Sequence, residues 1–317
     1  MKKSFYSLFT LVAITAIMFS CGKDPVPPVV EMFAEVNADN PYIIDFTTNV
    51  QNVTSYVWDF GDNETSTEAN PSHTYAMSGK YATKVTVTGD GGTAVATKDV
   101  TIAASIGELL SGGPSAANGK TWVFDTKVSA TDGAALINDA ISNVMPLQDN
   151  VLFGFGLGDE YDNEFTFKHD GSYSVNNVNG SMLAGVIYAE YGVAMGWHSI
   201  THPPTSYDIM MVGITHTAIN PSTWEYKKGD ITLTVRDDQD PMFGGTADAR
   251  EVTFTDADYF TTSGDIFGVK DFTQHIIIRD ITADRMQLSI LFHTNPPTYA
   301  KFMEHPSVMV TITYRVK

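Results

Sequence analysis

Three carboxylate side chains occur at alternate positions in the sequence, Glu160, Asp162 and Glu164. If this stretch forms a β-strand, its period of two places all three on one face. Hydrolysis of a glycosidic bond with retention of configuration uses two carboxyl groups about 5–5.5 Å apart, one protonated and one ionised. The spacing therefore permits a catalytic carboxylate pair. An acidic turn that leads into a strand at 164–168 would have the same sequence, and this alternative stays open.

Aromatic residues form a second candidate site, mainly in a stretch at 180–207 that glycine and proline interrupt. The C–H faces of a sugar ring pack on flat aromatic rings, while nearby polar side chains bind its hydroxyl groups. This composition predicts a carbohydrate platform, with Trp197 as its favoured ring because it stands outside any alternating pattern. The alternative is burial in a β-sandwich core. The candidates are Tyr191, Trp197, His198, Trp224 and Tyr226.

Metal-binding patterns are weak in this chain. His198 and His202 lie four residues apart, a spacing that suits zinc on a helix face, but two prolines follow at once and oppose a helix. Asp237, Asp238 and Asp240 follow a strand pattern and could hold Ca²⁺, yet they lack the spaced glycine of a calcium loop. We therefore predict no metal site and no cofactor, and expect the histidines to lie on the surface or in loops.

The secondary structure predicted around these residues consists almost entirely of strands. Polar and apolar residues alternate through most of the sequence, and Asp170-Gly171 and Lys228-Gly229-Asp230 are typical of hairpin turns. One stretch, 133–144, has apolar residues at helical spacing. The fold class is thus all-β, with a larger jelly-roll-like β-sandwich over 119–317. The clearest alternation there is at 120–125, 164–168, 172–175, 223–226, 231–236, 251–255 and 309–316.

Residues 56–81 carry a more specific pattern, YVWDFGDNETSTEANPSHTYAMSGKY. A W-D-F-G-D strand and turn precede N-P-x-H-x-Y and then G-x-Y-x-V-x-V-x-V, with Trp58, His73 and Val85 at their expected places. This pattern resembles the PKD domain. The resemblance covers residues 28–104 and implies an immunoglobulin-like β-sandwich that serves as a spacer, often beside carbohydrate-active domains. It also implies that His73 packs structurally.

The larger domain carries a looser resemblance. Its runs GKTWVFD, YDNEFTFKHDGSY and IIIRDITADRMQL look like the C-terminal domains of PKD-containing lipoproteins from Bacteroidetes glycan-uptake loci. Those domains are similar in shape to family 16 glycoside hydrolases and are generally thought to bind glycans without cleaving them. The family 16 motif E-x-D-x-E matches Glu160, Asp162 and Glu164, which would then be nucleophile, helper and acid/base.

The N-terminal residues resemble a bacterial lipoprotein signal. Lys2-Lys3 precede an apolar run at 8–19, and Ser20-Cys21-Gly22 follows as a lipobox. Cys21, the single cysteine, would become the lipidated first residue of the mature chain. The expected organisation is a signal peptide at 1–20, a tether at 21–27, the PKD domain at 28–104, a linker at 105–118 and the larger domain at 119–317. An ordinary secreted protein is the alternative.

The formal net charge of −18 opposes binding to nucleic acid. Three functions remain open. The first is a lipid-anchored outer-membrane protein that faces the cell exterior and binds polysaccharide for a glycan-uptake system, with an outer-membrane glycan transporter complex as a further partner. The second is an endo-acting β-glycanase that uses Glu160 and Glu164, and the third is a structural adhesin. The first is favoured, so a non-catalytic protein is expected.

Overall fold

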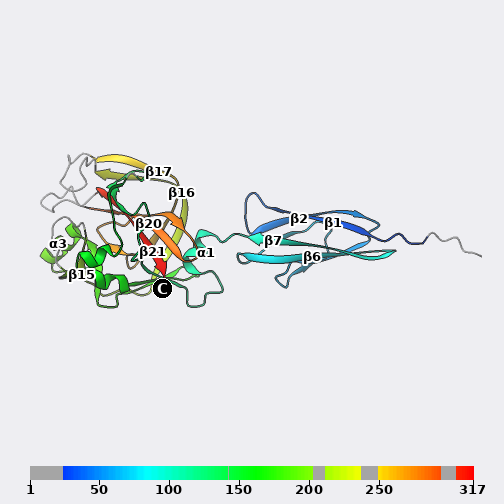
Figure 1. Cartoon of the computed structure of the whole chain (residues 1–317), viewed down its shortest axis with the longest axis horizontal. Coiled ribbons are helices and arrows are strands. Elements are labelled where there is room, and N and C mark those ends of the chain that lie inside the picture. The colour runs from blue at the N-terminus through cyan, green and yellow to red at the C-terminus, as the bar shows by residue number, and fades with distance from the viewer. Residues whose placement is uncertain (1–23, 142, 203–210, 237–248, 294–304) are drawn as a thin grey trace, which may run out of the picture. The chain divides into compact units, whose positions relative to one another are not determined.

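The computed structural model describes residues 24–141, 143–202, 211–236, 249–293 and 305–317 (Figure 1). The chain divides into two compact units, residues 1–103 and 104–317. Strands dominate both units, which confirms the all-β class with an immunoglobulin-like first domain and a larger β-sandwich. In the part of the chain that the structure describes, no helix has both the length and the apolar character needed to cross a bilayer.

The first domain pairs a three-stranded sheet, β1-β2-β5, with a four-stranded sheet, β4-β3-β6-β7. Alternation decides which side chains meet between them, because every second residue of a strand points to the same face. Val85 and Val87 on β6 are fully buried in this way. The strands are β1 Val29–Val36, β2 Ile43–Gln51, β3 Ser55–Asp59, β4 Thr65–Ser66, β5 Ser72–Thr74, β6 Gly79–Gly89 and β7 Gly92–Ile102.

Trp58 forms the centre of this first core and is 0% exposed. Its indole packs on Phe46 with ring centroids 5.3 Å apart, and its Nε1 donates a hydrogen bond to the Glu68 carbonyl. His73 is also buried. Its ring stacks on Phe60 at 4.0 Å and lies 2.6 Å from the Asp62 carboxylate, which is the structural role expected for it.

Eight antiparallel strands of the larger domain form a closed ring. Each strand pairs with the next of them along the chain, and β21 pairs back onto β8. This order is that of an up-and-down barrel, whereas a jelly roll connects its strands by Greek keys, so the jelly-roll topology is wrong in this detail. The strands are β8 Lys120–Phe124, β11 Glu164–Phe167, β12 Ser172–Asn176, β16 Ser222–Arg236, β17 Ala249–Ser263, β19 Ile276–Ile281, β20 Arg285–Phe292 and β21 Val308–Val316.

Side chains fill the interior of this ring. Phe267, from the connection between β17 and β19, is 0% exposed and lies within 6.4 Å, between ring centroids, of five other aromatic residues. An eight-stranded barrel is just wide enough for its side chains to fill it. The interior is therefore core, and a ligand site has to lie outside it. The five are Phe165, Phe167, Tyr173, Phe260 and Tyr314.

Three sequence predictions need correction here. Residues 133–144 do not form a helix, because β9 (Gly133–Leu136) pairs with β21 and with β10 (Asn143–Pro146). Pairing with the edge of a sheet outweighs local helical spacing. No hairpin turn occurs at 228–230, since β16 runs through it with a bulge. The expected linker at 105–118 contains α1 (Ile106–Ser111), whose Leu110 is fully buried in the larger domain's core.

A small subdomain inserted between β12 and β16 carries the aromatic stretch. It contains β13 (Ser181–Gly185), α3 (Val186–Ala194), β14 (Ile200–His202) and β15 (Met211–Thr215). The later strand β18 (Val269–Lys270) joins its sheet, in the order β14-β15-β13-β18. In Figure 1, α3 and β15 lie together in green. We call this subdomain, with β18, the cap. Two further short elements, α2 (Val151–Gly154) and the 3₁₀ helix η1 (Gly158–Asp162), precede it.

Candidate functional site

The end of α3 determines where Trp197 lies. Gly196 adopts the left-handed conformation with φ of +74°, which a glycine accepts without steric cost. The N–H of Trp197 donates to the Gly192 carbonyl at 2.8 Å, and that of Gly196 donates to Val193 at 3.1 Å. This pair of bonds is a Schellman motif, which ends a helix and redirects the chain. Trp197 therefore leaves the helix in a defined position.

The indole of Trp197 is exposed to solvent and packs against the rings of two tyrosines. It is 56% exposed. Its ring centroid lies 5.4 Å from that of Tyr191, in an edge-to-face arrangement, and 6.2 Å from that of Tyr188. Both tyrosines in turn contact Phe272. An aromatic ring that other rings hold in place presents a flat apolar surface at little further cost in side-chain entropy.

An open cavity of about 410 Å³ lies beside Trp197, within the size range of small-molecule sites. The cavity combines aromatic rings with hydroxyl, imidazole and ammonium groups from three parts of the cap. The α3 helix and the turn after it form one wall, the end of β15 forms another, and β18 contributes a cation. The lining residues are Tyr188, Trp197, His198, Thr215, His216, Thr217 and Lys270.

A glycine in α3 makes room for His198. A Cβ added to Gly192 would lie 2.0 Å from His198 Cε1, so only glycine allows the imidazole to rest on the helix there. His198 Nε2 is 3.0 Å from the Ala189 carbonyl and must donate to it, because a carbonyl oxygen only accepts. The ring also stacks on Tyr188 at 5.4 Å. Its position is thus fixed by backbone and ring contacts together.

Two lining residues, His216 and Lys270, belong to an ionic network built on Asp265, which is 0% exposed and does not itself line the cavity. His216 Nε2 lies 2.9 and 3.0 Å from its two carboxylate oxygens, and the N–H of Ile219 donates to it at 2.9 Å. Burial alone would raise the pKa of Asp265, but these hydrogen bonds hold the pKa below its ordinary value. Asp265 is therefore ionised, and Lys270 Nζ stands 3.7 Å from it.

The other two aromatic candidates lie elsewhere. Trp224 and Tyr226 are on β16 and do not line the cavity. The Trp224 indole packs edge to face on Phe167 and donates to the Lys168 carbonyl at 2.9 Å. Tyr226 donates its hydroxyl proton to Asp258 at 2.6 Å, and burial together with that carboxylate raises the pKa of the phenol well above its ordinary value. Both side chains are half-buried and have structural partners.

The three carboxylates do not share a strand face, which corrects the geometry expected for them. Glu160 and Asp162 belong to the 3₁₀ helix η1, and the strand begins only at Glu164. Glu160 is fully buried and accepts hydrogen bonds from Ser181 Oγ at 2.5 Å and Asn163 Nδ2 at 2.6 Å. Burial raises its pKa, against the opposing effect of those hydrogen bonds.

Glu164 and Asp162 lie in environments that differ from that of the buried Glu160. Glu164 pairs with Lys317, and its second carboxylate oxygen lies 3.4 Å from Asn176 Nδ2. Asp162 is exposed to solvent. The buried Glu160 thus connects η1 to the cap strand β13. Glu160 and Glu164 lie on different elements, so they do not form the expected carboxylate pair on one strand face.

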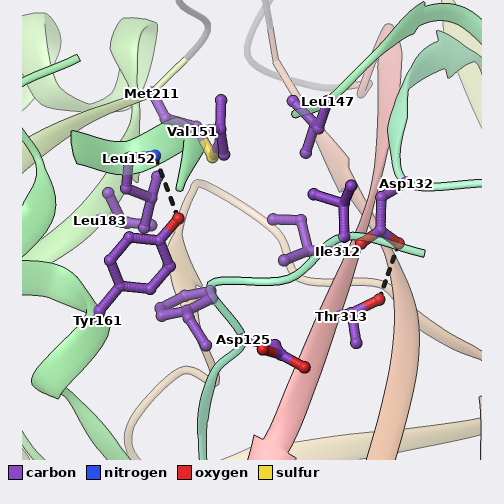
Figure 2. A pocket seen from close by; sticks show the side chains of 12 residues that line it. Asp125, Asp132, Leu147, Val151, Leu152, Tyr161, Leu183, Met211, Ile312 and Thr313 are labelled. Atoms are coloured by element: carbon purple, nitrogen blue, oxygen red, sulfur yellow. Dashed lines mark hydrogen bonds between the residues drawn. The ribbon is translucent and has the colours of Figure 1, made fainter. Parts of the chain in front are cut away.

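A second, smaller cavity lies beside η1 and is mainly apolar (Figure 2). Figure 2 shows the Tyr161 hydroxyl accepting from the Leu152 N–H at 3.3 Å, and Thr313 donating to Asp132 at 3.0 Å. At about 20 Å³ it has room for roughly one water molecule. It cannot admit a sugar ring without rearrangement.

Metal ligands do not gather in the described part of the chain, where no group of three His, Cys, Asp or Glu side chains has the geometry to hold an ion. The aspartates at 237, 238 and 240 that could bind Ca²⁺ lie outside the described residues, as does Cys21. His202 lies on β14 and does not line the cavity with His198.

The polar wall of the cavity is the part of the site that sequence reasoning missed. His216 was only one of several scattered histidines, and nothing near Lys270 in the sequence marks it as a site residue. The parallel pairing of β18 with β13 brings Lys270 into the cap, with Leu183 opposite Val269. Pairing of segments so far apart leaves no local signal in a single sequence.

Comparison with known proteins identifies one part of the chain. The family model described as "PKD domain" matches residues 25–104. Vibrio cholerae pre-pro-metalloprotease PrtV is 51% identical over 41 residues, which is 13% of this chain and 4% of that protein. Bacillus cereus collagenase ColQ1 is 38% identical over 151 residues, or 46% of this chain and 12% of that protein. The chain thus spans only a small fraction of the length of these relatives.

Two solved structures complete the comparison. The PKD1 domain of Vibrio cholerae PrtV covers 24% of this chain and 98% of its own, at 29% identity and a TM-score of 0.23. A structure of carbohydrate-binding modules from the β-sandwich superfamily covers 92% of both chains, at 11% identity and a TM-score of 0.25. Residues 25–104 are therefore a PKD domain, joined to a larger β-domain that carries the cavity beside Trp197.

Proposed function

We propose that the larger domain binds a carbohydrate in the cavity beside Trp197, without cleaving it. The observation that carries this proposal is an exposed indole, supported by Tyr188 and Tyr191, at the edge of an open cavity of about 410 Å³. A pyranose ring would stack its C–H face on the indole. Thr215, Thr217 and the imidazoles would then meet its hydroxyl groups.

The chemistry of the cavity favours binding over hydrolysis. A retaining glycosidase needs two carboxyl groups flanking the bond, and an inverting one needs them farther apart with a water between. Among the described residues, no carboxylate lines the cavity. Glu160 is buried behind β13, and Glu164 is engaged with Lys317. The described lining therefore has ring-stacking surfaces and hydrogen-bonding groups but no acid and base for glycoside cleavage.

The proposal extends to the rest of the chain. The PKD domain has its own core and would act as a folded spacer between the binding domain and the membrane. Lipidation of Cys21 would anchor the chain, because several acyl chains bind a bilayer far more durably than one, at about 0.8 kcal/mol per buried CH₂. The protein would then sit in the outer membrane, facing outward, and hand polysaccharide to a glycan transporter complex.

A panel of soluble polysaccharides in affinity gels, with reducing-sugar assays on the same samples, tests the binding proposal. Retardation by at least one polysaccharide without release of reducing ends is the expected result. Release of reducing ends by the wild type, lost in Glu160→Gln, would favour the glycanase alternative. If no polysaccharide in the panel is bound or cleaved, the result would contradict the binding proposal and favour a structural adhesin.

The anchor is tested separately by expressing Cys21→Ala in a Gram-negative host and fractionating the cells. The variant should move from the membrane to the soluble fraction, because the thiol that carries the lipid is gone. A matched change beside the lipobox, Lys23→Ala, should leave the protein in the membrane. Retention of Cys21→Ala in the membrane would contradict lipidation.

A further inference from the structure

The cavity lining differs in composition from the protein as a whole. The chain contains 37 acidic and 19 basic residues, for a net charge of −18. The cavity lining includes Lys270 and two histidines, and among the described residues no Asp or Glu lines it. A site for neutral sugars would have no need of an ammonium group, since carboxylates and amides bind hydroxyl groups equally well.

Lys270 is the group in this wall with hydrogen-bonding capacity to spare. Its side chain is only 15% exposed, so little solvent reaches it. Its Nζ lies 3.7 Å from Asp265 Oδ1, beyond hydrogen-bond length, and no hydrogen bond to Nζ occurs among the residues that the structure describes. An ammonium group has three N–H donors. Among the described residues, those donors therefore have no acceptor within hydrogen-bond distance.

Asp265 cannot satisfy Lys270 further, because its oxygens already have partners. Oδ1 accepts from the N–H of Ile266 at 2.9 Å and lies 2.9 Å from His216 Nε2. Oδ2 accepts from the N–H of Ile219 at 2.9 Å. Burial lowers the pKa of Lys270, and the charge of Asp265 opposes this effect. A second anion, supplied by a ligand, would complete the coordination of the ammonium group.

We infer that the cavity selects an acidic glycan, whose sugar ring stacks on Trp197 while its carboxylate or sulfate group binds Lys270. This inference rests on the proposed carbohydrate function and specifies its ligand class. Hydrogen bonds between ionised groups are shorter and roughly twice as strong as neutral ones, and partial burial protects them from screening by salt. His216 and Thr217 lie in the same wall and would contact the same anionic group.

The experiment compares related galactose-derived polymers by isothermal titration calorimetry. Polygalacturonate carries the carboxylate, its methyl ester lacks the charge, and a neutral galactan lacks the carboxyl group altogether. A sulfated galactan forms a fourth arm, which separates sulfate from carboxylate as the preferred anion. We expect the wild type to bind an anionic polymer about ten- to a hundredfold more tightly than its neutral counterparts, the equivalent of one charge-assisted hydrogen bond.

Lys270→Met keeps the length of the side chain and removes its charge. It should bind the anionic and neutral polymers with similar affinity. Its melting temperature should fall somewhat, because the buried Asp265 carboxylate loses a neighbouring cation, so affinities are compared at a temperature where both proteins are folded. Lys227→Met, on β16 outside the cavity, is the matched control and should retain the preference.

Three results would overturn the inference, and they differ in what else they contradict. Equal binding of charged and neutral polymers by the wild type, still lost in Trp197→Ala, would refute selection of an anion and leave carbohydrate binding intact. A preference for the anion that survives in Lys270→Met would place the anion site elsewhere. Failure to bind any of the four polymers or any of the wider panel would refute the proposed function itself.

Discussion

Trp58 and Trp197 are the same residue type in two domains, and the chain places them in opposite environments. Trp58 is 0% exposed at the centre of the PKD core, whereas Trp197 is 56% exposed at the rim of a cavity. The first lies on a strand, where alternation alone turns it inward. The second follows a helix that Gly196 ends, so a turn decides its direction. The proposed binding role rests on this exposure and on the aromatic rings that support the indole.

The largest effect should come from Trp58→Ala in the isolated PKD domain, residues 25–104. Removing a buried tryptophan loses its transfer free energy and leaves a cavity, which together cost about 3–5 kcal/mol of unfolding free energy. Urea denaturation followed by circular dichroism measures this. A change below about 1 kcal/mol, which is typical of a surface substitution, would mean that the core does not depend on Trp58. The contrast with Trp197 would then disappear.

Gly192→Ala tests whether the position of His198 in the cavity matters for binding. The new Cβ would occupy the place of the His198 ring, which must then move and lose its bond to Ala189. Carbohydrate affinity should fall several-fold. Stability should change by no more than about 1 kcal/mol, because alanine also favours the helix. Val193→Ala, an exposed neighbour on α3, is the control and should bind normally. Unchanged affinity of Gly192→Ala would show that His198 has no part in binding.

Glu160 gives a pH-dependent prediction for the junction between η1 and the cap. Its raised pKa means that the folded protein holds the carboxyl proton more tightly than the unfolded chain does. The resulting stabilisation is complete below the unfolded pKa of about 4.3 and is lost as the pH rises through the raised folded pKa. Glu160→Gln should remove this dependence and be at least as stable as the wild type at neutral pH. Thermal melts between about pH 4 and 8 test it, and a parallel decline in both proteins would contradict the assignment.

The sequence predicts the strand content and the PKD domain well, because alternation and turn residues act over a few positions. Val85 and Val87 are buried as their spacing requires. Closure of the ring is a different matter, since β8 and β21 pair across almost the whole larger domain. Residues 133–136 show the same limit. Their apolar spacing is compatible with a helix, and only the partner strand β21 decides for a hairpin.

The candidate site also contains residues that local sequence features indicate and residues that only long-range contacts bring together. Trp197 and His198 were accessible to sequence reasoning because Gly196 interrupts the pattern just before them. Lys270 was not, since it joins the site only through the pairing of β18 with β13, and neither was its buried neighbour Asp265. Glu160 departs from its expected place for a related reason. Its alternation with Glu164 suits a strand, but hydrogen bonds to more distant groups, Ser181 among them, hold Glu160 in a buried 3₁₀ turn instead.

The most direct test of the central claim is carbohydrate affinity and melting temperature measured on the same preparation of Trp197→Ala. Loss of the stacking surface should weaken binding at least about tenfold, the equivalent of roughly 1.4 kcal/mol. The melting temperature should barely move, because the indole is more than half exposed. Trp224→Ala, which removes a half-buried ring on β16, should show the reverse pattern. A large drop in melting temperature for Trp197→Ala with affinity intact would show that Trp197 supports the fold and that the ligand binds elsewhere.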